Sequence, residues 1–228
     1  MKKPDQPPLD IRPTESANAE ARAAIKELHD ELGATKKDVK EHPALQTHKE
    51  YLISLLAGAD RATNRISEKT LLPEQLAYAK KLLNNISVII GSLMEKTTMS
   101  PAEQEADLRV AIKQHLDNHY ERTLIELGPL EELVPKSSSL AIIIEPIKKN
   151  IQRAKQALDT LLNQTVADNF NQQVKTIESK LVDVNFDIME ELKSEAELDA
   201  SSRSPLPTAV TPVWNFSSNP LLPPADSD

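Results

Sequence analysis

The sequence predicts an all-α protein, a bundle of about five long antiparallel amphipathic helices plus a shorter N-terminal helix, with coiled-coil-like seams and disordered proline-rich ends. Three observations predict this fold. Only four glycines occur in 228 residues, which is too few for the tight turns of a sheet protein. Aromatic residues make up 3% of the chain, so leucine, isoleucine and alanine must fill the core. Apolar residues recur every three or four positions between prolines, which is the spacing of one helix face.

The first helix is predicted from about Thr14 to Leu32. The Thr14 side chain can cap the N-terminal backbone groups. Gly33 can take the left-handed conformation that commonly follows the last helical residue. The apolar seam of this helix consists of Ala21, Ile25, Leu28 and Leu32.

Prolines mark the starts of the next three helices, because proline is well tolerated at the first helical position and poorly tolerated in the interior. The second helix is predicted to begin at Pro43, the third at Pro73 and the fourth at Pro101. The fourth start is the clearest, since Ser100 and Glu103 have the spacing of a capping box. Gly128–Pro129 is predicted to end the fourth helix, followed by a connection to Ser139.

Residues 147–204 contain neither glycine nor proline, but the apolar phase slips near Asp168–Asn169. Two structures fit this pattern, a single helix of about 80 Å or a hairpin that turns near the slip. Basic residues gather at 148–155 and acidic residues at 187–199. A hairpin would place these opposite charges side by side, so the charge pattern favours the hairpin.

Gly58 and Gly91 fall inside the second and third helices, where each costs about 1 kcal/mol relative to alanine. We expect close approach of neighbouring helices to explain both positions.

Proline placement divides the chain into three parts. Residues 1–13 are predicted to be a disordered N-terminal segment, 14–200 the helical bundle domain, and 201–228 a disordered Pro/Ser-rich tail. The domain allows a further division into sub-units 14–128 and 137–200.

Composition excludes several function classes. The net charge of −8 opposes binding to nucleic acid, so no nucleic-acid partner is expected. The chain has no cysteine, which excludes thiolate catalysis and cysteine-ligated zinc. No apolar stretch reaches the roughly 18 residues of a transmembrane segment, and the N-terminus lacks the apolar region of a signal peptide. We therefore expect a cytoplasmic protein, or one exported without an N-terminal signal peptide.

Motifs for catalysis and cofactor binding are absent from the sequence. The four glycines are too dispersed for a phosphate-binding loop. His115 and His119 have the i, i+4 spacing of one helix face, but no glutamate directly follows His115 and no Glu-x-x-His motif occurs. The pair is therefore expected to be exposed. We expect no catalytic residue, no cofactor and no metal.

The tail carries an aromatic and apolar motif that a disordered segment does not need for its own stability. Tryptophan and phenylalanine are strong interface anchors, so these residues are the candidate partner-binding site. The tail either packs on its own bundle, serves as a linear motif for a protein partner, or has no binding role. The motif consists of Val213, Trp214, Phe216, Leu221 and Leu222.

The glutamate-rich stretch 190–197, followed by a flexible Ser/Pro-rich end, resembles the C-terminal translocation signals of bacterial type IV secretion effectors. This likeness is compositional and covers about 40 residues. Together these features predict a non-enzymatic helical protein-interaction module, acting as an adaptor, a scaffold or a secreted bacterial effector. Two alternatives stay open, a self-assembling coiled-coil protein that forms a homo-oligomer, and an enzyme with an unrecognised site.

Overall fold

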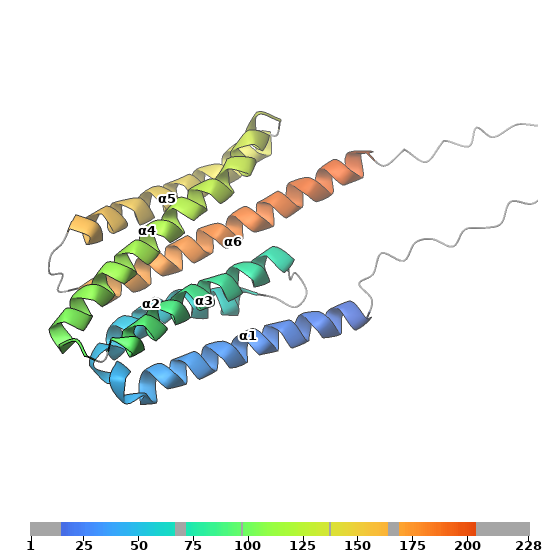
Figure 1. The fold of residues 1–228 in the computed structure, drawn as a ribbon. Helices are drawn as coiled ribbons and strands as arrows, with labels where there is room; N and C mark the ends of the chain where they lie inside the picture. The colour runs from blue at the N-terminus through green and yellow to red at the C-terminus, as the bar shows by residue number, and fades with distance from the viewer. Residues whose placement is uncertain (1–14, 67–71, 97, 137, 164–168, 204–228) are drawn as a thin grey trace, which may run out of the picture.

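The computed structural model describes residues 15–66, 72–96, 98–136, 138–163 and 169–203 (Figure 1). No strand occurs in these ranges, which confirms the all-α fold. The predicted disordered ends and the tail motif lie outside the described residues. The helices are α1 (Glu15–Glu41), η1 (Pro43–His48), α2 (Lys49–Arg65), α3 (Pro73–Glu95), α4 (Pro101–Leu133), η2 (Val134–Lys136), α5 (Ser138–Asn163) and α6 (Phe170–Arg203).

Helix α6 occupies the centre of the molecule, where it contacts α2, α3, α4 and α5 (Figure 1). Helix α1 lies on the outer side of α2 and α3. Helices α5 and α6 are separate and pack together, so they form a hairpin and not one long helix; residues 164–168 between them lie outside the described residues. Helix α6 belongs to the second suggested sub-unit, but it packs on α2 and α4, which belong to the first.

The central place of α6 follows from a buried apolar surface that is wider than one stripe. A helix with one apolar stripe packs on one face only, whereas a wider apolar surface needs neighbouring helices on more than one side. The buried apolar residues of α6 are Phe170, Val174, Ile177, Leu181, Val182, Val184, Phe186 and Ile188.

Two predicted helix ends are wrong, because burial favours continuation of the helix. Helix α1 runs through Gly33 to Glu41 and gains the fully buried Val39. Helix α4 runs through Gly128 and Pro129 to Leu133, although Pro129 cannot donate the hydrogen bond of an interior helical residue. Leu130, which is fully buried, lies just beyond that proline.

Of the three helix starts predicted at prolines, two are confirmed and the third begins a different type of helix. Helix α3 begins at Pro73, as predicted. Helix α4 begins with the predicted capping box, in which Ser100 N–H donates to Glu103 Oε2 at 2.9 Å. Pro43 begins a 3₁₀ helix and not an α-helix.

The prediction that the N-terminal helix is shorter than the others is wrong. The shortest described α-helix is α2, with 17 residues, whereas the N-terminal α1 has 27. Helix α5 begins at Ser138 and contains Pro146 in its interior. Leu140 and Ile144 are buried in its first turns, and this burial explains why the helix begins before Pro146.

The charge pattern predicted ion pairs between α5 and α6, but charged residues of these two helices pair elsewhere. Lys148 of α5 pairs with Glu131 of α4 at 2.7 Å, and Lys155 pairs with Asp159 on its own helix at 3.2 Å. Asp187 of α6 pairs instead with Arg65 of α2, at 3.0 Å. Apolar burial between α5 and α6 therefore explains the hairpin better than ion pairing does.

None of the described helices is long and apolar enough to cross a membrane.

Candidate functional site: a buried glutamate between two histidines

The most unusual feature of the core is a fully buried carboxylate on the central helix. Glu178 of α6 is 0% exposed. Two histidines of α4 face it, with His115 Nε2 2.7 Å from Glu178 Oε1 and His119 Nδ1 3.1 Å from Glu178 Oε2. Isolated buried charges are costly, so a carboxylate persists in a core only with such partners.

The two histidine contacts differ in geometry. His119 and Glu178 meet the criteria of a hydrogen bond. His115 Nε2 and Glu178 Oε1 are closer, yet they are poorly aligned for an N–H···O bond, and neither atom has a hydrogen-bond partner among the described residues. Buried polar atoms usually have a hydrogen-bond partner, so two neighbouring buried atoms without one are unusual.

Tyr78 of α3 completes the group from the other side of His119. Its hydroxyl lies 2.6 Å from His119 Nε2, and it is buried like the histidine. With the proton on Nδ1, His119 donates to Glu178 and accepts the Tyr78 hydroxyl proton at Nε2. This tautomer satisfies both ring nitrogens at once.

Gly58 of α2 lies on the remaining side of the carboxylate. A Cβ at position 58 would overlap Glu178 Oε2 and lie 3.1 Å from Glu178 Cδ. The expectation of close approach is therefore met at Gly58. It is not met at Gly91, because a Cβ there would have nothing within 4 Å.

The electrostatics of the group favour an ionised glutamate. Burial raises the pKa of Glu178, but the electrostatic interaction with His119 and then with His115 outweighs it and lowers the pKa to about 2. Burial, followed by the charge of Glu178, raises the pKa of Tyr78 well above its ordinary value. Glu178 is therefore a carboxylate, and Tyr78 a neutral phenol, near neutral pH.

A second polar contact joins α6 to α4 two turns further along. Asn185 Nδ2 donates to Thr123 Oγ1 at 2.7 Å and to the Leu181 carbonyl at 2.8 Å. Asn185 and Thr123 are both buried. Glu178 and Asn185 together fix the register of α6 against α4, because a shift of either helix would leave buried polar groups unpaired.

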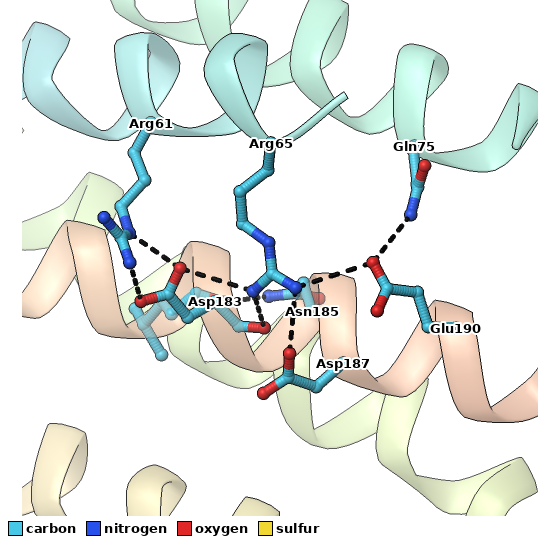
Figure 2. Close-up of polar contacts among 8 residues, drawn as sticks. Arg61, Arg65, Gln75, Asp183, Asn185, Asp187 and Glu190 are labelled. Atoms are coloured by element: carbon cyan, nitrogen blue, oxygen red, sulfur yellow. Dashed lines mark hydrogen bonds and ion pairs between the residues drawn. The ribbon is translucent and has the colours of Figure 1, made fainter. Parts of the chain in front are cut away.

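A third set of polar contacts holds α2 to a different face of α6 (Figure 2). Arg61 forms a two-pronged contact with Asp183, at 2.6 and 2.7 Å. Arg65 reaches Asp183, Asp187 and Glu190, and its guanidinium lies 5.1 Å from the ring centroid of Phe186. In Figure 2 Gln75 of α3 also points to Glu190, so α2 and α3 both form polar contacts with α6.

Two hollows flank the buried group. A cavity of about 440 Å³ between α3 and α4 reaches both His115 and His119. A groove of about 680 Å³ lies between α3, α4 and α6. Tyr78 and Arg122 line both.

Two sets of residues follow from the sequence, the predicted partner-binding residues of the tail and the histidine pair that is expected to be exposed. The tail residues Val213, Trp214, Phe216, Leu221 and Leu222 lie outside the described residues. His115 and His119 are 8% and 6% exposed, so the expectation of exposed histidines is wrong.

One pattern in the sequence does indicate that His115 and His119 are buried. Positions 108, 112, 115 and 119 continue one helical stripe that begins with the buried Leu108 and Ile112. For Glu178 we find no such signal beyond its place next to Ile177.

Fold and site together define an all-helical protein whose central helix carries a buried carboxylate held by two histidines. No family model, curated protein or solved structure matches this chain.

Proposed function

We propose that this chain is a non-enzymatic protein-interaction module, an adaptor or scaffold that acts by binding a protein partner. The observation that carries the proposal is the groove of about 680 Å³ between α3, α4 and α6. Its lining combines the apolar Leu72, Met189 and Leu192 with charged side chains of both signs, such as Glu126 and Lys193. Such a mixture suits an amphipathic helix or a short apolar segment of another protein.

The wider features of the chain agree with this proposal. In this proposal the helices pack as an antiparallel bundle with coiled-coil-like seams, an architecture that would present rigid helical surfaces to partners. The net charge of −8 makes nucleic acid a poor partner. In this proposal the protein acts in the cytoplasm or is exported without an N-terminal signal peptide, and the composition of the glutamate-rich stretch 190–197 with the Ser/Pro-rich end would suit export.

The tail supplies a second contact in this proposal. Trp214 and Phe216 serve as anchors, with Val213, Leu221 and Leu222 as supporting apolar contacts. The anchors either enter the groove of the same chain or bind the partner directly.

The groove is tested by substitutions that place charge in its lining. Met189→Glu and Leu192→Glu are suitable because both side chains are partly exposed and line the groove. Val110→Glu is the matched control, since Val110 is 64% exposed and does not line the groove. We expect affinity capture from a native lysate to retain the same partner with the wild type and the control, and to lose it with both groove variants. Capture that is equal in all four proteins would contradict the proposal.

The role of the tail is tested by the fluorescence of Trp214, which is the only tryptophan of the chain. Docking in the groove would shift its emission to shorter wavelength in the purified protein, and Leu192→Glu would reverse the shift. Emission typical of a solvated indole, together with loss of partner capture on deletion of residues 204–228, would assign the tail to the partner.

Self-assembly is the second candidate, and two exposed isoleucines favour it. Ile125 of α4 is 73% exposed and Ile142 of α5 is 76% exposed. In this second proposal a second copy of the chain covers these side chains, which lie on two helices that pack together. Light scattering at several concentrations measures the molecular mass and so distinguishes a monomer from an oligomer. The double variant Ile125→Glu with Ile142→Glu would dissociate an oligomer, whereas it would leave the mass of a monomer unchanged.

A further inference from the structure

We propose that His115, His119 and Glu178 together bind one divalent transition-metal ion of the zinc type. The three residues each offer one donor atom, and these atoms lie within 4.8 Å of one another in the core. The inference does not rest on the proposed function, because the three ligands belong to α4 and α6 and none of them lines the groove.

The donor set suits this class of ion. Two imidazole nitrogens and one carboxylate oxygen are the protein ligands of many catalytic zinc sites. Calcium and magnesium prefer all-oxygen sets, which the two histidines do not provide. Cobalt(II) accepts the same ligands as zinc and gives a visible spectrum, so it is a suitable probe.

The distances are close to those of a coordination shell. Donor atoms about 2.1 Å from a tetrahedral ion lie about 3.4 Å apart. Each histidine contacts a different oxygen of Glu178, at 2.7 Å for His115 Nε2 and 3.1 Å for His119 Nδ1. All three donor atoms lie within 4.8 Å of one another, so the ion would draw the donors together by up to about 1.4 Å to reach the spacing of a coordination shell. His115 Nε2 and Glu178 Oε1 are close without a hydrogen bond, which is the arrangement of two atoms that converge on a third.

Tyr78 supplies the outer contact that such sites require. A ligating histidine almost always donates its second ring N–H to a nearby oxygen, which fixes the orientation of the ring. If His119 binds the metal through Nδ1, its Nε2–H points to the Tyr78 hydroxyl oxygen at 2.6 Å. Tyr78 is thus a positioning residue, and it does not need to touch the ion.

The ion has a route to the site and space for further ligands. The cavity of about 440 Å³ between α3 and α4 includes both histidines in its lining. Three protein ligands leave at least one position for water, which this cavity can hold. The cavity also contains Gln114, Asn118 and Arg122, whose polar groups can bond that water.

The experiment uses the full chain freed of metal with a chelator. Titration with Co²⁺ alone, followed by visible absorption, is expected to saturate at one ion per chain, and Zn²⁺ is expected to displace it. His115→Ala, His119→Ala and Glu178→Gln should each abolish the visible band. His29→Ala is the matched control, because His29 is an exposed histidine outside the group, and it should bind as the wild type does.

Tyr78→Phe provides a variant that keeps all three ligands. Loss of an outer contact typically weakens metal affinity by about 10–100-fold, so Co²⁺ binding should weaken by that factor. Circular dichroism establishes that each variant is folded, and Tyr78→Phe decides the matter if the ligand variants unfold. Zn²⁺ at a hundredfold excess over its Kd should also raise the Tm of the wild type by about 5–10 °C.

Three results would overturn the proposal. The first is the absence of saturable Co²⁺ binding, which would leave the group as a hydrogen-bonded ion pair. The second is binding that His29→Ala removes, which would place the ion on the surface. The third is binding that Tyr78→Phe leaves at full strength.

Discussion

The carboxylate of Glu178 lies directly against the bare α-carbon of Gly58. A Cβ at that position would overlap Glu178 Oε2 and lie 3.1 and 3.2 Å from Glu178 Cδ and Cβ. Helix α2 can therefore come this close to Glu178 only because position 58 carries no side chain. The other sides of the carboxylate are taken by His115 and His119, so Gly58 helps to hold it in place.

Gly58→Ala is expected to destabilise the protein by about 1–3 kcal/mol, although alanine is the better helix former. The new methyl group must displace either α2 or the Glu178 side chain, and both carry buried contacts. Urea unfolding followed by circular dichroism measures the change. Gly91→Ala is the control, because a Cβ there meets nothing within 4 Å and should stabilise α3 by about 0.5–1 kcal/mol. Two variants of equal stability would contradict the overlap at Gly58.

Replacement of one member of the buried pair should cost more than replacement of both. His119→Leu leaves the Glu178 carboxylate with only the poorly aligned His115, which we expect to cost about 3–5 kcal/mol. Glu178→Met with His119→Leu removes the buried charge as well, so the double variant should be more stable than the sum of the two single changes predicts. Unfolding in the presence of a chelator measures all three. Additive effects would show that the two side chains are not coupled.

Arg65 is expected to contribute more to stability than Arg61. Arg65 is 26% exposed and contacts three carboxylates and the Phe186 ring, whereas Arg61 is 49% exposed and pairs only with Asp183 among the described residues. Arg65→Ala should cost about 1–2 kcal/mol and Arg61→Ala about 1 kcal/mol or less.

Arg65→Lys tests the shape of the guanidinium, because lysine keeps the charge but not the planar fork. We expect it to recover less than half of the stability that Arg65→Ala loses. Thermal unfolding at low and high salt provides the measurement. A full recovery would show that charge alone matters at this position.

The pH dependence of Glu105 provides a test away from the buried group. The Tyr51 hydroxyl donates to Glu105 Oε1 at 2.7 Å, and this bond is the main cause that lowers the Glu105 pKa below 4.5. A lowered pKa in the folded state means that this contribution to stability is present above about pH 4.5 and is lost as the pH falls through the folded pKa. Tyr51→Phe should return the pKa toward 4.5 and remove that contribution.

Titration of the Glu105 carboxyl by NMR measures this shift. Tyr120→Phe is the control, because the Tyr120 ring faces Lys155, whose Nζ lies 4.8 Å from the ring centroid. The Glu105 pKa should be unchanged in that variant. An unchanged pKa in Tyr51→Phe would show that Arg109, which lies 2.9 Å from Glu105, dominates instead.

The helical character of the chain was open to prediction from local pattern, because helix propensity, apolar spacing and caps act over a few residues. The capping box at Ser100 and Glu103 and the start of α3 at Pro73 are examples. The ends at Gly33 and Pro129 were not predictable in this way. There the burial of Val39 and Leu130 favours longer helices, and that burial depends on neighbours far away in the sequence.

By itself, the sequence determined that this protein is helical, lacks cysteine and carries an aromatic motif near its end. Only the tertiary structure decided that α6 lies at the centre, with other helices on nearly every side. A polar residue on an outer helix would face water, but Glu178 on the central helix cannot. Its charge therefore has to be met by His115 and His119, which lie about 60 residues away and which no local pattern connects to it.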